Sequence, residues 1–184
     1  MHAASHMADF INLPCHDEDG NALVVVEAPR GSLVKLKYDP QKNVFMFDRA
    51  LILGVTYPYD WGFIPSTKGE DGDPLDAMVL FDAPTWPGVV IPSAPIGIVR
   101  VQQRDGKKGP PFRNDRVIAV PVDDPRYEDV SDLPKRVRKE LEEFFIAVSR
   151  MADKQVTIQG WDGGKAARRA IRQAAEQYIR RGAA

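Results

Sequence analysis

Apolar and polar positions alternate in short runs over the first two thirds of the chain, which is typical of β-strands. The pattern predicts strands at residues 22–28, 32–38, 44–47, 77–81, 89–91, 96–102 and 116–121. Turn residues separate the first three, so we expect an antiparallel meander there. The segment 57–65 is rich in aromatic residues and contains two prolines, which favours a fixed irregular segment.

The period of the apolar positions changes after residue 132. Apolar residues then recur at helical spacing and predict a long helix over 133–151, with Ser131 or Asp132 as its N-cap. A short strand at 156–159 precedes a second helix at 164–181, for which Asp162 is the expected cap. A closed or nearly closed sheet of short strands followed by two late helices is an α+β fold.

Composition places the chain among single-domain proteins. Its 184 residues suit one domain at 7–184, and residues 1–6 read as an added leader before Met7. The net charge of −1 argues against nucleic acid, and no apolar run is long enough to span a membrane. We find no secretion signal, and the lone Cys15 favours a cytoplasmic protein. All three histidines precede the first strong apolar run, which argues against histidine-based catalysis.

The strongest chemical signal is an acidic loop before an apolar strand. Asp71, Asp73 and Asp76 fall within six residues, beside Gly72 and Pro74, which favour a tight and rigid path. Converging carboxylates repel one another unless a cation lies between them, and oxygen ligands suit Mg²⁺. The plain alternative is an acidic surface loop, whereas a calcium-binding EF-hand lacks its closing glutamate here.

The loop 71–76 resembles the signature of the soluble family I inorganic pyrophosphatases. Further segments follow in that family's order, namely 24–29, 34–35, 47–49, 57–58, 62–64, 117–121, 144–145 and 160–161. The resemblance covers roughly residues 20 to 180. It implies a five-stranded OB-type β-barrel with the two C-terminal helices packed outside. It also implies Mg²⁺-dependent hydrolysis of pyrophosphate by a metal-activated water, with Mn²⁺ as an alternative metal, in a homo-oligomer.

The resemblance assigns roles to individual residues. It implies that Asp73 accepts the proton of the attacking water and that Tyr57 lies beside it. The implied metal ligands are Asp71, Asp76 and Glu27, with Asp115 as a substitute for a neighbouring ligand. The implied substrate-binding residues are Lys35, Lys37, Arg49, Trp61 and Arg116.

The chain also departs from the family pattern at several ligand positions. These positions carry Lys37, Trp61, Gln103, Arg104, Asn114, Val148 and Ser149. Three functions follow: hydrolysis of pyrophosphate at a reduced rate, the same hydrolysis of another diphosphate or a polyphosphate, or a non-catalytic relative. The retained acidic loop favours the first, and the apolar replacements favour the second.

Overall fold

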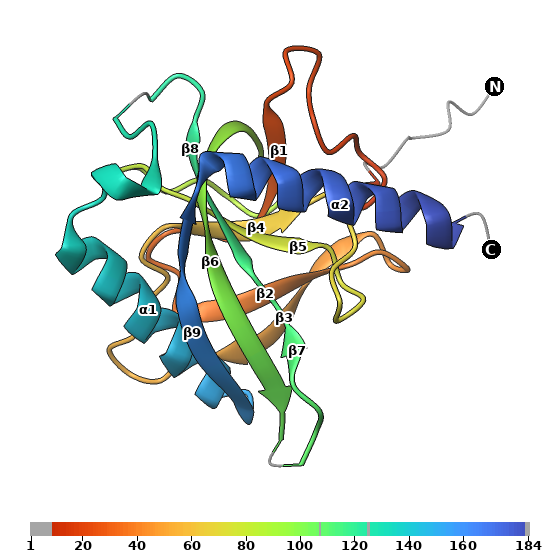
Figure 1. Ribbon diagram of the computed structural model, residues 1–184. Helices are drawn as coiled ribbons and strands as arrows, with labels where there is room; N and C mark the ends of the chain where they lie inside the picture. Colours follow the sequence, from red (N-terminus) through yellow and green to blue (C-terminus); the bar gives the residue numbers. More distant parts are fainter. Residues whose placement is uncertain (1–8, 107, 125, 183–184) are drawn as a thin grey trace.

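The computed structural model describes residues 9–106, 108–124 and 126–182, so the expected leader at 1–6 lies outside the described residues. The strands are β1 (Ala22–Ala28), β2 (Val34–Asp39), β3 (Val44–Ala50), β4 (Asp60–Ile64), β5 (Leu75–Val79), β6 (Val90–Asp105), β7 (Phe112–Arg113), β8 (Arg116–Pro121) and β9 (Lys154–Gly163). A 3₁₀ turn (Val130–Asp132) leads to helix α1 (Lys135–Arg150), and α2 (Gly164–Gly182) ends the described chain (Figure 1).

Five strands close on themselves. β1 pairs with β4, β4 with β5, β5 with β8, β8 with β6, and β6 returns to β1. Only the β5–β8 pair in this ring is parallel. The ring, with both helices outside it, confirms the predicted α+β fold and the expected five-stranded closure (Figure 1).

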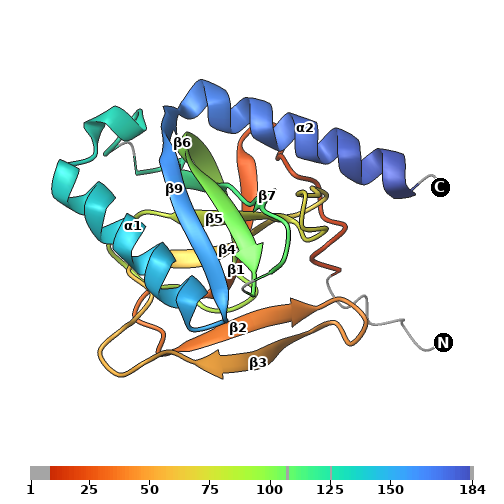
Figure 2. The ribbon, with the colours of Figure 1, turned by 60° about the horizontal axis from the view of Figure 1, so that its bottom comes forward.

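Strands β2 and β3 form a separate hairpin below the ring (Figure 2). The predicted meander of the first three strands is therefore wrong. Both edges of β1 are already occupied, by β4 on one side and β6 on the other, so β2 cannot join it as a neighbour. The hairpin instead carries the side chains of β2 and β3 to the mouth of the ring.

Prolines mislead the prediction in two places. The segment 57–65 contains the fully buried strand β4, because Pro58 and Pro65 lie just outside its paired residues. The separate strands expected at 89–91 and 96–102 are one strand, β6, whose register against β8 shifts between Pro95 and Gly97. A bulge of this kind lets one strand bend and continue past proline.

The helices cover β9 and β6, as Figure 1 shows, and both expected caps are wrong. Asp129 caps the 3₁₀ turn, and α1 begins after Pro134 without a side-chain cap. Asp129 also accepts the Gly164 N–H at 3.0 Å at the start of α2, whereas Asp162 pairs with Arg100. In the part of the chain that the structure describes, no helix is long and apolar enough to cross a bilayer.

Candidate active site

The acidic loop is held in shape by its own backbone. Gly72 has a φ of 89°, which favours glycine, and the Asp71 carboxylate accepts the Asp73 N–H at 3.1 Å. The Gly69 N–H donates to the Asp73 carbonyl at 2.8 Å. Asp76 follows on β5, two residues after Pro74. The loop therefore presents its carboxylates from a fixed frame rather than from a free surface segment.

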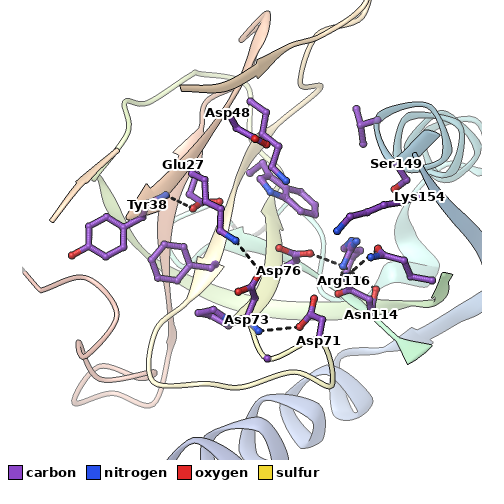
Figure 3. A pocket seen from close by; sticks show the side chains of 18 of the residues that line it. Glu27, Tyr38, Asp48, Asp71, Asp73, Asp76, Asn114, Arg116, Ser149 and Lys154 are labelled. Atoms are coloured by element: carbon purple, nitrogen blue, oxygen red, sulfur yellow. Dashed lines mark hydrogen bonds and ion pairs between the residues drawn. The ribbon is translucent and has the colours of Figure 1, made fainter. Parts of the chain in front are cut away.

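These carboxylates line a pocket of about 550 Å³ between the ring, the β2–β3 hairpin and α1 (Figure 3). The pocket brings together ten of the eleven predicted site residues, which are Glu27, Lys35, Lys37, Arg49, Tyr57, Trp61, Asp71, Asp73, Asp76 and Arg116. They come from β1, β2, β3, β4, β5, β8 and the loops between them. Residues far apart in sequence thus converge on one cavity.

The eleventh residue, Asp115, does not line this pocket. Its carboxylate accepts the Val101 N–H at 3.0 Å and pairs with Arg113 at 2.5 Å. It lines a smaller neighbouring pocket, which Asp71 and Asn114 also line. Its assignment as a substitute metal ligand therefore stays a prediction.

Two cations already neutralise two of the carboxylates. Lys37 Nζ lies 2.9 Å from Asp73 Oδ2, with both side chains more than half exposed. Arg116 Nη1 lies 2.5 Å from Asp76 Oδ2, and the Arg116 side chain is only 9% exposed. The Arg116 guanidinium also lies 5.5 Å from the centre of the Trp61 ring. Trp61 therefore supports a buried cation.

Burial and like charge perturb two of the acids. Burial raises the pKa of Glu27 to about 7, although the Tyr38 N–H donates to this carboxylate at 2.7 Å. Burial also raises the pKa of Asp71, and the nearby charges of Asp76 and Asp73 raise it further. Negative charge is therefore concentrated where the loop meets β5.

The opposite wall is cationic. Lys35 and Arg49 are register partners in the β2–β3 hairpin. Burial lowers the pKa of Lys35, with a smaller contribution from Arg49, while Asp76 opposes the shift. Arg49 pairs with Asp48 at 2.7 Å, and its buried Nε has no hydrogen-bond partner among the described residues. Burial raises the pKa of Tyr57, so its hydroxyl stays neutral at ordinary pH.

The donor set fits a hard divalent cation, although the carboxylates do not form a closed cage. Among residues 9–106, 108–124 and 126–182, no three histidine, cysteine or carboxylate side chains lie close enough to hold a metal ion. The Asp76 charge nevertheless helps to raise the pKa of Asp71, and a cation near both carboxylates would relieve this repulsion. Their oxygens are the ligands that Mg²⁺ prefers.

Sequence reasoning missed three charged residues of the pocket, Asp48, Lys68 and Lys154. Lys154 begins β9 and lines the pocket together with Ser149 and Asn114 (Figure 3). Its Nζ lies 3.8 Å from Asp105. Asp48 could have been suspected from its place beside Arg49. No sequence pattern marked Lys154, because its direction depends on the turn between α1 and β9.

The ring and the pocket together define a class of small β-rich proteins in which cationic side chains and an acidic loop line one pocket. The family model described as inorganic pyrophosphatase matches residues 24–179, and the chain belongs to this family, as the sequence resemblance indicated.

Similar proteins carry the name of the same family. An inorganic pyrophosphatase of Synechocystis is 40% identical over 156 residues, which is 83% of this chain and 89% of the relative. One of Methanosarcina acetivorans is 37% identical over 85% of this chain and 91% of its own. The crystal structure of inorganic pyrophosphatase from Thermus thermophilus superposes with a TM-score of 0.83 at 36% identity, covering 94% of this chain and 99% of that one.

Proposed function

We propose that this protein hydrolyses inorganic pyrophosphate to two phosphates, with Mg²⁺ as its metal and Mn²⁺ as the alternative. The observation that carries the proposal is the pocket itself, which the acids of the 71–76 segment line together with six lysine and arginine side chains. The names of the relatives support the substrate. A metal ion held by Asp71 and Asp76 would neutralise substrate charge and acidify water.

The cationic wall supplies what phosphoryl transfer needs most. The reaction spreads negative charge over phosphoryl oxygens, and catalysis consists largely of neutralising and positioning that charge. Lys35 and Arg49 approach from the hairpin, and Arg116 approaches from β8. Fixed cations in a partly buried pocket need little reorganisation as the reaction proceeds.

We assign proton transfer to Asp73. Water attacks one phosphorus, the bridging P–O bond breaks, and the Asp73 carboxylate takes a proton from the attacking water. Lys37 holds this carboxylate at 2.9 Å in the free protein. The pair is largely exposed, so it is weakly held and Lys37 can turn to a substrate oxygen. Tyr57, neutral and buried, borders the same space. We assign Glu27 an indirect role at the metal, through water.

The metal assignment is tested by calorimetry. The double variant Asp71→Asn/Asp76→Asn should lose most Mg²⁺ binding, because both carboxylate charges are removed. Glu18→Gln, at an exposed position, is the control and should bind like the wild type. Equal Mg²⁺ binding by the double variant and the wild type would refute the assignment.

The apolar side of the pocket favours a second candidate, an organic diphosphate. Three apolar residues of α1 line the pocket, namely Phe144, Phe145 and Val148. The centre of the Trp61 ring lies 5.9 Å from that of Phe145. Val148 and Trp61 lack the hydroxyl groups with which the family pattern binds phosphate at these positions. Each such charge-assisted hydrogen bond lost from the transition state costs about 1.5–3 kcal/mol, or roughly one to two decades in rate. We therefore expect measurable but slow pyrophosphate hydrolysis.

Phosphate release from pyrophosphate, triphosphate, nucleotides and small diphosphate esters separates the candidates. Fastest release from pyrophosphate supports the main proposal. Preference for an ester supports the second candidate. No release from any substrate, with Mg²⁺, Mn²⁺ or Zn²⁺, would indicate a binding protein instead of an enzyme.

We also propose that the protein is a homo-oligomer. Large apolar side chains are exposed on and beside the hairpin, with Leu33 at 61%, Phe47 at 64% and Ile52 at 55%. Exposed apolar groups close to one another favour association. A monomer mass by light scattering at micromolar concentration would contradict this.

A further inference from the structure

A chain of amide hydrogen bonds runs through the wall of the pocket behind Arg116. The Gln103 side-chain amide donates to Asp105 at 3.0 Å, and the Asn114 amide donates to Gln103 Oε1 at 3.2 Å. Arg116 Nη1 donates to the Asn114 carbonyl at 2.9 Å and also to Asn114 Oδ1. Gln103 is 1% exposed, so this relay is buried at its centre.

The relay ends on the carboxylate that we assign to the metal. Arg116 Nη1 pairs with Asp76 at 2.5 Å (Figure 3). The guanidinium also lies over the Trp61 ring. The contacts with Asn114 and Asp76 use Nη1, whereas a guanidinium carries five N–H donors. The donors on Nε and Nη2 suit a phosphate oxygen. One side chain thus serves both the acid and the anion.

Holding Arg116 in place affects the two ligands of the pocket in opposite ways. A divalent cation competes with the guanidinium for the Asp76 carboxylate, so a firmly held Arg116 weakens metal binding. A phosphate gains from the same firm hold, because less side-chain freedom is lost when it binds. The positions of Gln103 and Asn114 therefore bear on both affinities through Arg116.

We propose that Gln103 and Asn114 are positioning residues that fix Arg116 between Asp76 and the phosphate site. They thereby lower the affinity of the pocket for the metal and raise its affinity for phosphate. The inference rests on the proposed function only in taking Mg²⁺ and phosphate as the ligands of the pocket. It assigns Gln103 a role through Asn114 and Arg116, in the manner of outer partners that orient a ligand-binding side chain.

The test uses the full chain and two titrations, Mg²⁺ alone and inorganic phosphate alone in a chelating buffer. Gln103→Leu keeps the approximate volume but removes the relay. We expect the Mg²⁺ dissociation constant to fall, and that of phosphate to rise, each by roughly two- to tenfold for one lost hydrogen bond. Gln102→Leu is the matched control, since Gln102 is exposed on the same strand and should leave both constants unchanged.

A second variant tests the order of the relay. Asn114→Leu should shift both constants in the same directions, and Gln103→Leu should add nothing in its presence, because Gln103 acts only through Asn114. If a thermal melt shows Gln103→Leu to be unfolded, Asn114→Leu at its half-buried position gives the same opposed shifts.

Certain results would overturn the inference. General damage to the pocket would weaken the binding of both Mg²⁺ and phosphate. A role in packing alone would leave both dissociation constants unchanged. Additive effects in the double variant would remove Gln103 from the relay. Neither titration needs turnover, so failure of the proposed hydrolysis would appear in the phosphate-release panel and not here.

Discussion

Replacing Glu27 by glutamine should change the pH dependence of stability. Glu27 is 7% exposed and accepts the Tyr38 N–H at 2.7 Å, an interaction that a glutamine oxygen can keep. Burial raises its pKa from an ordinary 4.5 to about 7 in the folded protein. The two pKa values differ by about 2.5, which corresponds to about 3 kcal/mol.

The sign follows from proton uptake. Between pH 4.5 and 7 the folded protein keeps the Glu27 proton and the unfolded chain releases it. The raised pKa of Glu27 therefore makes its full contribution to the unfolding free energy of the wild type below pH 4.5. This contribution is lost as the pH rises to about 7. Glutamine does not titrate. The unfolding free energy of the variant should therefore rise relative to that of the wild type by about 2–3 kcal/mol between pH 5 and pH 8.

Urea unfolding at four pH values from 5 to 8, with a chelator to remove divalent cations, measures this gain. The gain corresponds to roughly 4–12 °C in Tm. The exposed Glu18→Gln is the matched control and should follow the wild-type curve. A constant difference between Glu27→Gln and wild type across the range would show that Glu27 is not held protonated, and would refute the reasoning.

Three further predictions concern the reaction and the ring. Asp73→Asn should abolish pyrophosphate turnover and leave Mg²⁺ binding by calorimetry largely intact, because the amide cannot take a proton; unchanged turnover would contradict its role. Lys154→Met should raise KM by roughly tenfold, as one charge-assisted contact is lost, while Lys165→Met on the exposed face of α2 should not; equal KM values would remove Lys154 from substrate binding. Gly62→Ala should lower the unfolding free energy by about 3 kcal/mol or more, since its Cβ would lie 1.8 Å from the Val25 carbonyl oxygen; an unchanged urea midpoint would contradict the close pairing of β1 and β4.

The sequence was most informative where chemistry and local geometry coincide. The segment 71–76 combines carboxylates with glycine and proline, and this rigid loop forms as predicted. Lys35 and Lys37 alternate along β2, so both reach the pocket from one face of the hairpin.

Other features depend on long-range packing. Strand β4 forms despite its flanking prolines, because β1 and β5 pair with it on both sides. The direction of Lys154 follows from the turn before β9, where Asp153 has a φ of 53°. The Asp129 cap on α2 joins residues 35 positions apart, beyond any local pattern. The conformation of these segments is therefore determined by contacts in the assembled sheet and not by their local sequence.

The length of β6 bears on how the chain folds during synthesis. This strand pairs with β1 near the N-terminus and with β9, whose last residue is Gly163. The edge of β6 that β9 covers therefore stays bare until most of the chain has left the ribosome. Pairing across such sequence separations is slow, because a long loop must close before its contacts form. The sheet should therefore be completed only after β9 has emerged, and a nascent chain that stalls before β9 should aggregate through that edge.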